Sequence, residues 1–451
     1  MNKIAADFSK NTGKIKIMHS VNNGPAGSDV RGTSNLKYFR EAGIPYARNH
    51  DAAFYEGYGG EHTVDVHRIF KNFDADENDQ RSYDFEMTDT YMKRTEEAGV
   101  KTFYRLGARI EHEKKEGTFP PKDFGKWARI CEHIIRHYNE GWANGFRMGI
   151  EYWEIWNEPD CCNPDGTKPC WQGTMEQFSE FFATVLKYLK TTFPRLKIGG
   201  PSLSVCENDE NNKMIFDAIK AAGIIPDFFS FHAYTDNPAN YYRFGEKGYS
   251  ILKEYGLEGK TELILNEWNY VRGWIGKDYT YSIRSIKGLK GSSFIAGTMC
   301  TGQKSKLDHM MYYDARPSEW NSLFDTDFLT PLKGYYPFKM YNELYKMGNG
   351  FLCDSDSDCF YSIAAGSEDM YGIMFTYFDD NEYAEAKEAE LSFLNLPVSE
   401  NKPMTAEYFL LDENNDMKLI RSEKITSKAF KTYLDVSLYS TYFIRISSTR
   451  Q

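Results

Sequence analysis

Two short segments of the sequence each place a glutamate at the end of a strand-like run, beside aromatic residues and an amide. Residues 152–160 have the sequence Tyr-Trp-Glu-Ile-Trp-Asn-Glu-Pro-Asp, and residues 263–269 have the sequence Leu-Ile-Leu-Asn-Glu-Trp-Asn. In both segments the last glutamate, Glu158 or Glu267, follows an asparagine. Two carboxyl groups that flank one glycosidic bond are able to cleave it. Glu158 and Glu267 are therefore candidates for such a pair.

The surroundings of Glu158 predict that it donates a proton. Strand alternation places Glu154, Trp156 and Glu158 on one face of the first run, and Pro159 ends the run. A carboxyl group between Trp156 and Pro159 is expected to be partly desolvated, which raises its pKa. Such a group is suited to protonate a leaving oxygen.

Glu267 follows an apolar run that is typical of a strand buried on both faces. If the two runs are the fourth and seventh strands of a barrel, the carboxyl groups lie about 5 Å apart, the separation at which one carboxylate attacks the sugar directly. Glu267 would then be the nucleophile, and Glu158 would first protonate the leaving oxygen and afterwards deprotonate water. The alternative is that both are surface glutamates at strand ends, which the matching Asn-Glu flanks disfavour.

The chain around these segments alternates strand-like and helix-like patterns, as in a barrel of eight parallel strands that are each followed by a helix. Strands are predicted at residues 15–19, 46–50, 101–106, 152–157, 197–200, 228–233, 262–266 and 308–313. Helices are predicted at residues 35–42, 86–98, 123–139, 175–192, 211–222, 241–255 and 281–288. The long segment 56–83 predicts an extended loop on the side of the barrel where sites form.

After residue 348 the pattern changes to short strands separated by Asp, Asn, Gly and Pro, which is typical of an antiparallel β-sandwich. These strands are predicted at residues 360–364, 371–376, 389–394, 405–411, 430–434 and 442–447. Residues 3–8 are expected to add one more strand to it. The predicted fold class is α/β, with a (β/α)8 TIM barrel over residues 15–347 and a C-terminal antiparallel β-sandwich domain built from residues 1–14 and 348–451.

The two glutamate motifs resemble those of the retaining (β/α)8 glycosidases, and within that clan the chain most resembles glycoside hydrolase family 39, the family of β-xylosidases and α-L-iduronidases. Arg48-Asn49-His50 is similar to its Arg-x-His ending of the second strand, and Phe231-His232-Ala233-Tyr234 is similar to its His-x-Tyr of the sixth strand. The resemblance implies that Asn157 contacts the sugar 2-hydroxyl. It also implies that His50 and His232 line the subsite of the cleaved sugar and that Tyr234 forms a hydrogen bond near the nucleophile.

Further candidate ligands of the sugar follow the eighth predicted strand. Asp314 and Trp320 are expected to contact sugar hydroxyls and to stack on a sugar ring. Residues 61–67 have the spacing of metal ligands, but substrate contacts are the favoured interpretation of this segment. Residues 354–358 are acidic, and a solvated turn is favoured there over a calcium loop. We therefore expect no metal and no cofactor.

The eight cysteines do not decide the compartment. Cys161, Cys162 and Cys170 follow the first glutamate motif and are expected to shape the leaving-group side of the site. Whether these three form disulfides stays open, as does a bridge between Cys353 and Cys359.

The composition favours a sugar over a nucleic acid as the partner. A formal net charge of −11 argues against binding driven by phosphate attraction, and an aromatic content of 16% fits stacking on sugar rings. No apolar run of about 18 residues occurs, and the amino end is polar without a signal-peptide core. We expect no membrane contact, and either a cytoplasmic protein or a mature exported form without its leader; the oligomeric state stays open.

The predicted function is that of a retaining, exo-acting glycoside hydrolase of a plant-type or other oligosaccharide or glycoside, with β-xylosidase activity as the default that the resemblance implies. Arabinosyl, glucosyl and galactosyl substrates stay open. One alternative is a carbohydrate-binding barrel without catalytic activity. Another is a transglycosidase that uses the same two glutamates.

Overall fold

The computed structural model describes residues 2–28, 32–51, 63–318, 320, 323–399 and 402–448. Glu61 and His62 of the predicted metal-ligand spacing lie outside the described residues, as does the first part of the predicted loop 56–83. The described part of that loop contains the short helix α2 (Val66–Ile69) and the 3-10 turn η1 (Gln80–Ser82).

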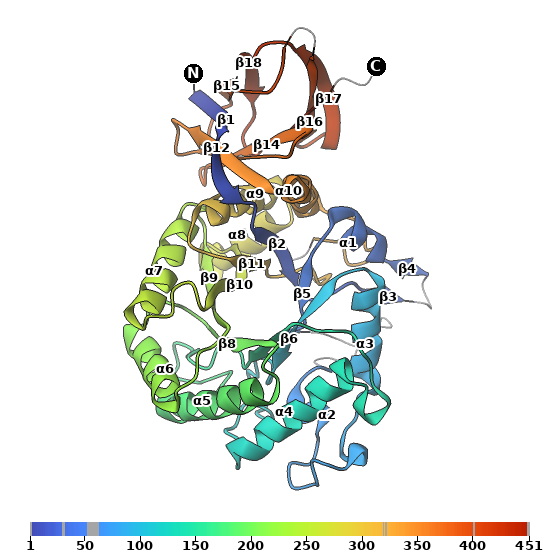
Figure 1. Cartoon of the computed structure of the whole chain (residues 1–451), viewed down its shortest axis with the longest axis vertical. Coiled ribbons are helices and arrows are strands. Elements are labelled where there is room, and N and C mark those ends of the chain that lie inside the picture. The colour runs from blue at the N-terminus through green and yellow to red at the C-terminus, as the bar shows by residue number, and fades with distance from the viewer. Residues whose placement is uncertain are drawn as a thin grey trace.

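Eight parallel strands close into a barrel in the order β10-β11-β2-β5-β6-β7-β8-β9, which forms the lower and larger part of the molecule in Figure 1. Their bounds are β2 (Ile17–Asn22), β5 (Tyr46–Arg48), β6 (Lys101–Leu106), β7 (Tyr152–Ile155), β8 (Lys197–Leu203), β9 (Phe228–Thr235), β10 (Glu262–Tyr270) and β11 (His309–Tyr312). Each overlaps one of the eight predicted strands. The predicted TIM barrel is therefore confirmed. A separate two-stranded sheet joins β3 (Gly27–Ser28) and β4 (Thr33–Ser34).

Helices surround the barrel strands (Figure 1). Their bounds are α1 (Leu36–Ala42), α3 (Glu86–Glu97), α4 (Phe124–Asn139), α5 (Met175–Thr192), α6 (Asp209–Ala222), α7 (Asn240–Glu254), α8 (Gly276–Ile286), α9 (Leu289–Lys304) and α10 (Tyr336–Met347), with 3-10 turns η2 (Trp142–Asn144) and η3 (Lys333–Tyr335). The sequence did not predict α9 or α10. Residues 290–302 of α9 are all buried, so its sequence has no polar face that would reveal a helical period. Within the described residues, no helix is both long and apolar enough to cross a membrane.

The barrel interior is arranged in layers that follow from strand alternation. The floor is a cluster of inward-facing apolar side chains from six strands. It consists of Tyr46, Phe103, Tyr152, Phe228, Ile264 and Met311. Two residues further along their strands, the inward positions are polar: Tyr46 is followed by Arg48, Tyr152 by Glu154 and Ile264 by Asn266. The apolar floor closes one end of the barrel, and the polar layer lies toward the carboxyl ends of the strands, where barrel sites form.

A second domain consists of one nine-stranded, mostly antiparallel sheet in the order β17-β16-β19-β14-β13-β12-β1-β15-β18. Its strands are β1 (Asn2–Lys14), β12 (Asn349–Ser355), β13 (Phe360–Gly366), β14 (Met370–Tyr377), β15 (Lys387–Leu394), β16 (Met404–Leu411), β17 (Asp416–Ile425), β18 (Phe430–Val436) and β19 (Thr441–Ser448). The strand predicted at the amino end joins this sheet, pairing antiparallel with β12 and parallel with β15. The sheet encloses its own apolar core, which confirms the predicted β-domain. The strands β12 and β17 were not predicted.

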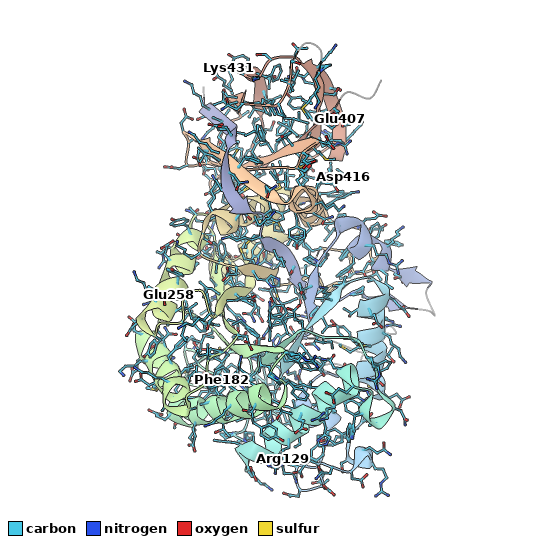
Figure 2. The ribbon with its side chains drawn as sticks, viewed as in Figure 1. Arg129, Phe182, Glu258, Glu407, Asp416 and Lys431 are labelled. Atoms are coloured by element: carbon cyan, nitrogen blue, oxygen red, sulfur yellow. The ribbon has the colours of Figure 1, made fainter. Side chains whose placement is uncertain are left out.

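Polar contacts connect this domain to the strand that carries Glu267. The carboxylate of Asp380, after β14, accepts hydrogen bonds from the Tyr270 hydroxyl at 2.7 Å and from Arg272 at 2.6 Å. Lys290 of α9 donates to the backbone oxygen of Asp380 at 2.7 Å. These contacts hold the carboxyl end of β10 against the second domain. Among the residues labelled in Figure 2, Arg129 on a barrel helix and Glu407 on the second domain each form a half-buried ion pair, with Glu77 and Arg445 respectively.

Candidate active site

Two left-handed residues after β7 aim Asn157 and Glu158 into the barrel mouth. The strand ends at Ile155, and Trp156 and Glu158 then have φ angles of 78° and 46°. The simple alternation predicted from the sequence is therefore wrong beyond Ile155. Trp156 turns outward, 5.1 Å from the ring of Trp171, and its indole nitrogen donates to the backbone oxygen of Cys170.

Irregular pairing of β10 has the same effect on Glu267. The pairing of β10 with β9 shifts register between Leu265 and Glu267, so that the consecutive residues Asn266 and Glu267 both face the barrel interior.

A close approach of strand β8 to strand β7 completes the polar layer of the barrel interior. Gly200 has a φ of 137°, and a Cβ atom there would lie 2.8 Å from the backbone oxygen of Ile155, so a larger residue would push the two strands apart.

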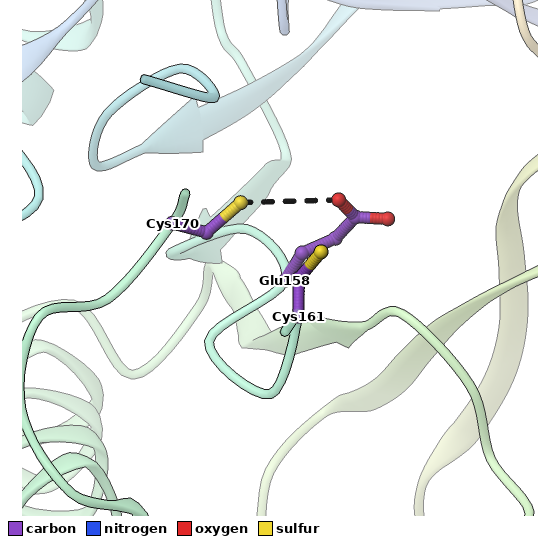
Figure 3. A group of neighbouring side chains, drawn as sticks. All are labelled: Glu158, Cys161 and Cys170. Carbon is purple, nitrogen blue, oxygen red and sulfur yellow. Dashed lines mark hydrogen bonds between the residues drawn. The ribbon is translucent and has the colours of Figure 1, made fainter. Parts of the chain in front are cut away.

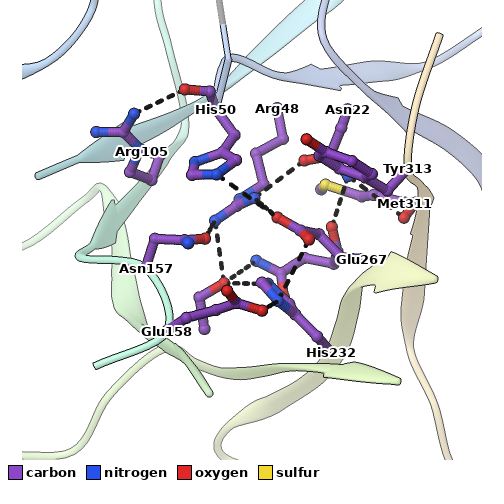
Figure 4. A network of polar contacts seen from close by, with 12 residues as sticks. Asn22, Arg48, His50, Arg105, Asn157, Glu158, His232, Glu267, Met311 and Tyr313 are labelled. Carbon is purple, nitrogen blue, oxygen red and sulfur yellow. Dashed lines mark hydrogen bonds and ion pairs between the residues drawn. The ribbon is translucent and has the colours of Figure 1, made fainter. Parts of the chain in front are cut away.

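Arg48 is the centre of the polar layer (Figure 4). Its fully buried guanidinium donates to Glu154 at 2.6 Å and to Glu267 at 2.8 Å. It also donates to Asn157 at 2.7 Å and to Ser202 at 3.0 Å. One cation thus fixes the positions of side chains from β7, β8 and β10, and it lies in direct contact with one of the two candidate carboxylates.

Removing this cation is expected to destabilise the protein strongly. Arg48→Met leaves the buried carboxylates of Glu154 and Glu267 without their counter-charge, and breaking a buried pair in this way costs about 3 to 5 kcal/mol. The measurement is the free energy of unfolding in urea. The matched control is Arg445→Met, which removes a half-exposed pair with Glu407 and should cost about 1 kcal/mol or less. Equal losses in the two variants would contradict the central role of Arg48.

His232 lies between the two candidate carboxyl groups, and its neighbours determine its tautomer. Ser202 Oγ accepts from Arg48 at 3.0 Å and from Asn266 at 3.0 Å, so its own proton points to His232 Nε2 at 2.6 Å. Nδ1 of the neutral ring therefore carries the hydrogen. The Nδ1 nitrogen lies 2.7 Å from Oε1 of Glu158 and 3.3 Å from Oε2 of Glu267. Burial lowers the pKa of His232 to about 4, so the ring is neutral near pH 7.

The two carboxyl groups have different electrostatic surroundings. Burial raises the pKa of Glu158 to about 7, against the opposing charge of Arg48, which does not contact it. Burial also raises the pKa of Glu267, but the His232 ring, the Arg48 guanidinium and the Tyr234 hydroxyl, which donates at 2.8 Å, stabilise its charged form. Of the two, Glu158 is therefore the group that holds a proton near neutral pH. Desolvation of Glu158, which the sequence predicted, is the first cause of this shift, and the predicted share of Trp156 and Pro159 in it stays a prediction.

The carboxyl groups lie close enough to act on one bond. One oxygen of Glu158, Nδ1 of His232 and one oxygen of Glu267 all lie within 4.8 Å of one another. This spacing would also suit a metal ion. The Arg48 guanidinium, 2.8 Å from Glu267, opposes a second positive charge at this position.

The structure brings most of the other predicted ligands to the same place. His50 lies with Nε2 4.0 Å from Glu267, and burial lowers its pKa well below the usual value, so it is neutral. Asn157 accepts from Arg48 through Oδ1, while its buried Nδ2 has no hydrogen-bond partner among the described residues. That donor is available to a ligand.

Trp320 and Asp314 differ in their placement. The Trp320 ring stacks on Trp274 with centroids 6.1 Å apart and lies 6.5 Å from the ring of Tyr234, the residue that donates to Glu267. Asp314 is fully buried, accepts a hydrogen bond from Asn23 at 2.6 Å, and has its pKa raised to about 7 by burial. A sugar contact by Asp314 stays a prediction.

Sequence reasoning missed several residues of this site. Ser202 and Glu154 were not singled out as ligands, and Arg48 was noted only as part of a motif. For Arg48 and Glu154 the available signal was a charged residue two positions after an inward aromatic residue on a predicted strand. No comparable signal marks Ser202, because it depends on the irregular backbone after Gly200.

Part of the chain that carries this site is similar to a known protein family. Residues 43–247 match the family model of glycosyl hydrolases family 39. The resemblance inferred from the motifs is thereby confirmed. The matched segment contains Arg48, Glu158 and His232, whereas Glu267 lies beyond it.

A curated relative and two solved structures are also similar. A β-xylosidase from Geobacillus stearothermophilus is 30% identical over 128 residues, which are 27% of this chain and 23% of the xylosidase, so the match spans less than a quarter of that relative. The fold is that of a glucosidase from Croceicoccus marinus, with a TM-score of 0.81 at 20% identity over the whole of both chains. A family 39 enzyme from Xanthomonas axonopodis pv. citri has a TM-score of 0.70 at 12% identity, covering 99% of this chain and 97% of that one.

Proposed function

We propose that the protein is a retaining glycoside hydrolase in which Glu267 is the nucleophile and Glu158 is the acid and base. The observation that carries this proposal is a pair of buried carboxyl groups, one directly after β7 and one on β10, with oxygens within 4.8 Å of each other; the Glu267 carboxylate is bonded to Arg48 and the Glu158 carboxyl has its pKa raised to about 7. A retaining pair needs one ionised and one protonated carboxyl group at this kind of separation.

The reaction has two displacements. In the first, a Glu267 oxygen bonds to the anomeric carbon while the bond to the leaving oxygen breaks, and Glu158 transfers its proton to that oxygen. In the second, water attacks the anomeric carbon, Glu158 takes a proton from the water, and the ester bond to Glu267 breaks. His232 Nδ1–H, within reach of both carboxyl groups, stabilises whichever of them is charged.

Binding of the sugar uses the donor that the protein leaves unpaired. Asn157 Nδ2 is buried without a partner among the described residues, so a sugar hydroxyl that accepts its hydrogen bond removes the cost of burying that donor. Trp274 and Trp320 offer a stacked aromatic wall at the mouth for a sugar ring. We propose that this wall limits the site to a terminal sugar, which makes the enzyme exo-acting.

An activity panel tests the function. The β-xylosidase relative makes aryl β-xylosides the first substrates to try, and the glucosidase of similar fold adds aryl glucosides, with oligosaccharides of the same sugars to follow. Release of phenol together with single sugars as the first oligosaccharide product supports the proposal. Sugar binding without phenol release from any aryl glycoside would instead identify a non-catalytic binding barrel.

The pH dependence of kcat/KM is expected to have a falling basic limb near pH 7. Glu158 must be protonated to assist the leaving group, and burial raises its pKa to about 7, so the active fraction declines as pH rises through that value. The measurement is kcat/KM for an aryl glycoside between pH 4 and 9. Activity that stays constant up to pH 9 would contradict the role of Glu158, and Glu158→Ala should lose the limb.

A further inference from the structure

Two thiol groups that the proposed mechanism does not use lie beside Glu158 (Figure 3). Cys161 follows in the turn after β7, where its backbone nitrogen donates to the backbone oxygen of Glu158 at 3.0 Å. The loop then returns and brings the Cys170 thiol to the same carboxyl group (Figure 3). Both cysteines are free thiols.

The three side chains have the spacing of metal ligands. The Sγ atoms of Cys161 and Cys170 and one carboxylate oxygen of Glu158 all lie within 4.8 Å of one another, and Cys170 Sγ lies 3.9 Å from Glu158 Oε2. Tetrahedral ligands at zinc-to-sulfur and zinc-to-oxygen distances are about 3.5 to 3.8 Å apart. Cys170 Sγ and Glu158 Oε2, 3.9 Å apart, already lie close to this spacing, and the other two separations need shifts of at most about an ångström to reach it.

The surrounding structure holds the ligands and leaves one side open. Trp156 Nε1 donates to the backbone oxygen of Cys170 at 3.0 Å, and a turn with a hydrogen bond from Asn163 to Thr167 at 2.8 Å closes the loop between the two cysteines. His232 contacts Oε1 of Glu158, so Oε2 is the oxygen that faces the thiols. Cys170 is 1% exposed, whereas Cys161 is half-buried and gives an ion and a water ligand a path to the site.

We propose that Cys161, Cys170 and Glu158 form a binding site for a thiophilic divalent cation such as Zn²⁺ or Cd²⁺. On binding, each thiol loses its proton to solvent and forms a metal–sulfur bond, and Glu158 also releases its proton to solvent and supplies the third ligand through Oε2. A carboxylate bound to the metal cannot donate a proton, so occupancy switches off the acid function. This inhibitory consequence rests on the proposed function, whereas the binding site itself does not.

Cadmium titration of the full chain, reduced with the non-thiol reductant TCEP, tests the site directly. We expect one Cd²⁺ per chain with the ultraviolet charge-transfer absorption of two thiolates. Cys161→Ser should lower that absorption by half or more and raise the Kd at least about tenfold. The matched control is Cys162→Ser, which changes the exposed neighbouring thiol and should leave both unchanged.

Further measurements separate this proposal from the proposed function. Zn²⁺ should raise the thermal unfolding temperature of the wild type and of Cys162→Ser but not of Cys161→Ser, and Cys170→Ser should behave like Cys161→Ser if it folds. In an active enzyme, Zn²⁺ should inhibit the first two proteins and spare Cys161→Ser. An unchanged absorption in Cys161→Ser, or an equal loss in Cys162→Ser, would overturn the site whether or not the protein hydrolyses glycosides.

Discussion

Glu267→Ala is expected to lower kcat by at least about four orders of magnitude, because the variant has no group that can form the glycosyl ester. Binding of the sugar should change much less, since Asn157, His50 and the aromatic wall remain. The measurements are kcat and KM for an aryl glycoside that the wild type cleaves. The matched control is Glu262→Ala, which removes a carboxylate from the opposite end of the same strand, where it pairs with Lys197 at 2.7 Å.

The same variant allows a stereochemical test of the role. Azide is small enough to occupy the space that the Glu267 carboxyl group vacates and to attack the anomeric carbon in one step, which gives a glycosyl azide of inverted configuration. In the wild type, a 2-fluoro glycoside with a good leaving group should label Glu267, and mass spectrometry of the peptides locates the added sugar. A label on another carboxylate, or full activity of Glu267→Ala, would remove Glu267 from the mechanism.

The elements that carry the two glutamates could be predicted because their sequences follow simple rules. Residues 263–265 are continuously apolar, as expected for a strand covered on both faces, and residues 152–155 end before a proline. Most helices with a polar face were predicted for the same reason, although α10, which also has one, was not. The α9 helix was not, because it lies between the barrel and the second domain and is buried on all sides along residues 290–302.

The contacts within the site could be predicted only in part. Sequence motifs identified Glu158, Glu267, His232 and Tyr234, and the structure brings these four side chains together. Three features escaped sequence reasoning because they depend on backbone irregularities or on inward residues of different strands that meet only in the closed barrel. They are the left-handed turn at Trp156, the register shift before Glu267 and the convergence of polar side chains on Arg48.

Glu158→Ala is expected to have an effect that depends on the leaving group. With a poorly activated glycoside, loss of the proton donor should lower kcat/KM by about 10² to 10⁴-fold. With a dinitrophenyl glycoside, whose leaving group needs no proton, formation of the glycosyl ester should proceed, while its hydrolysis is slowed because no base deprotonates water. The control is Glu151→Ala, at the opposite end of β7, where Glu151 pairs with Lys197 at 3.2 Å.

Azide distinguishes the two glutamates by the product it forms. In Glu158→Ala, azide enters the space left by the carboxyl group and attacks the ester to Glu267 without needing a base. Two successive inversions then give a glycosyl azide of retained configuration, opposite to the product from Glu267→Ala. Nuclear magnetic resonance of the anomeric proton separates the two products. Because His232 lies between both carboxyl groups, the product configuration, and not the loss of activity alone, decides which glutamate attacks the sugar and which one carries the proton.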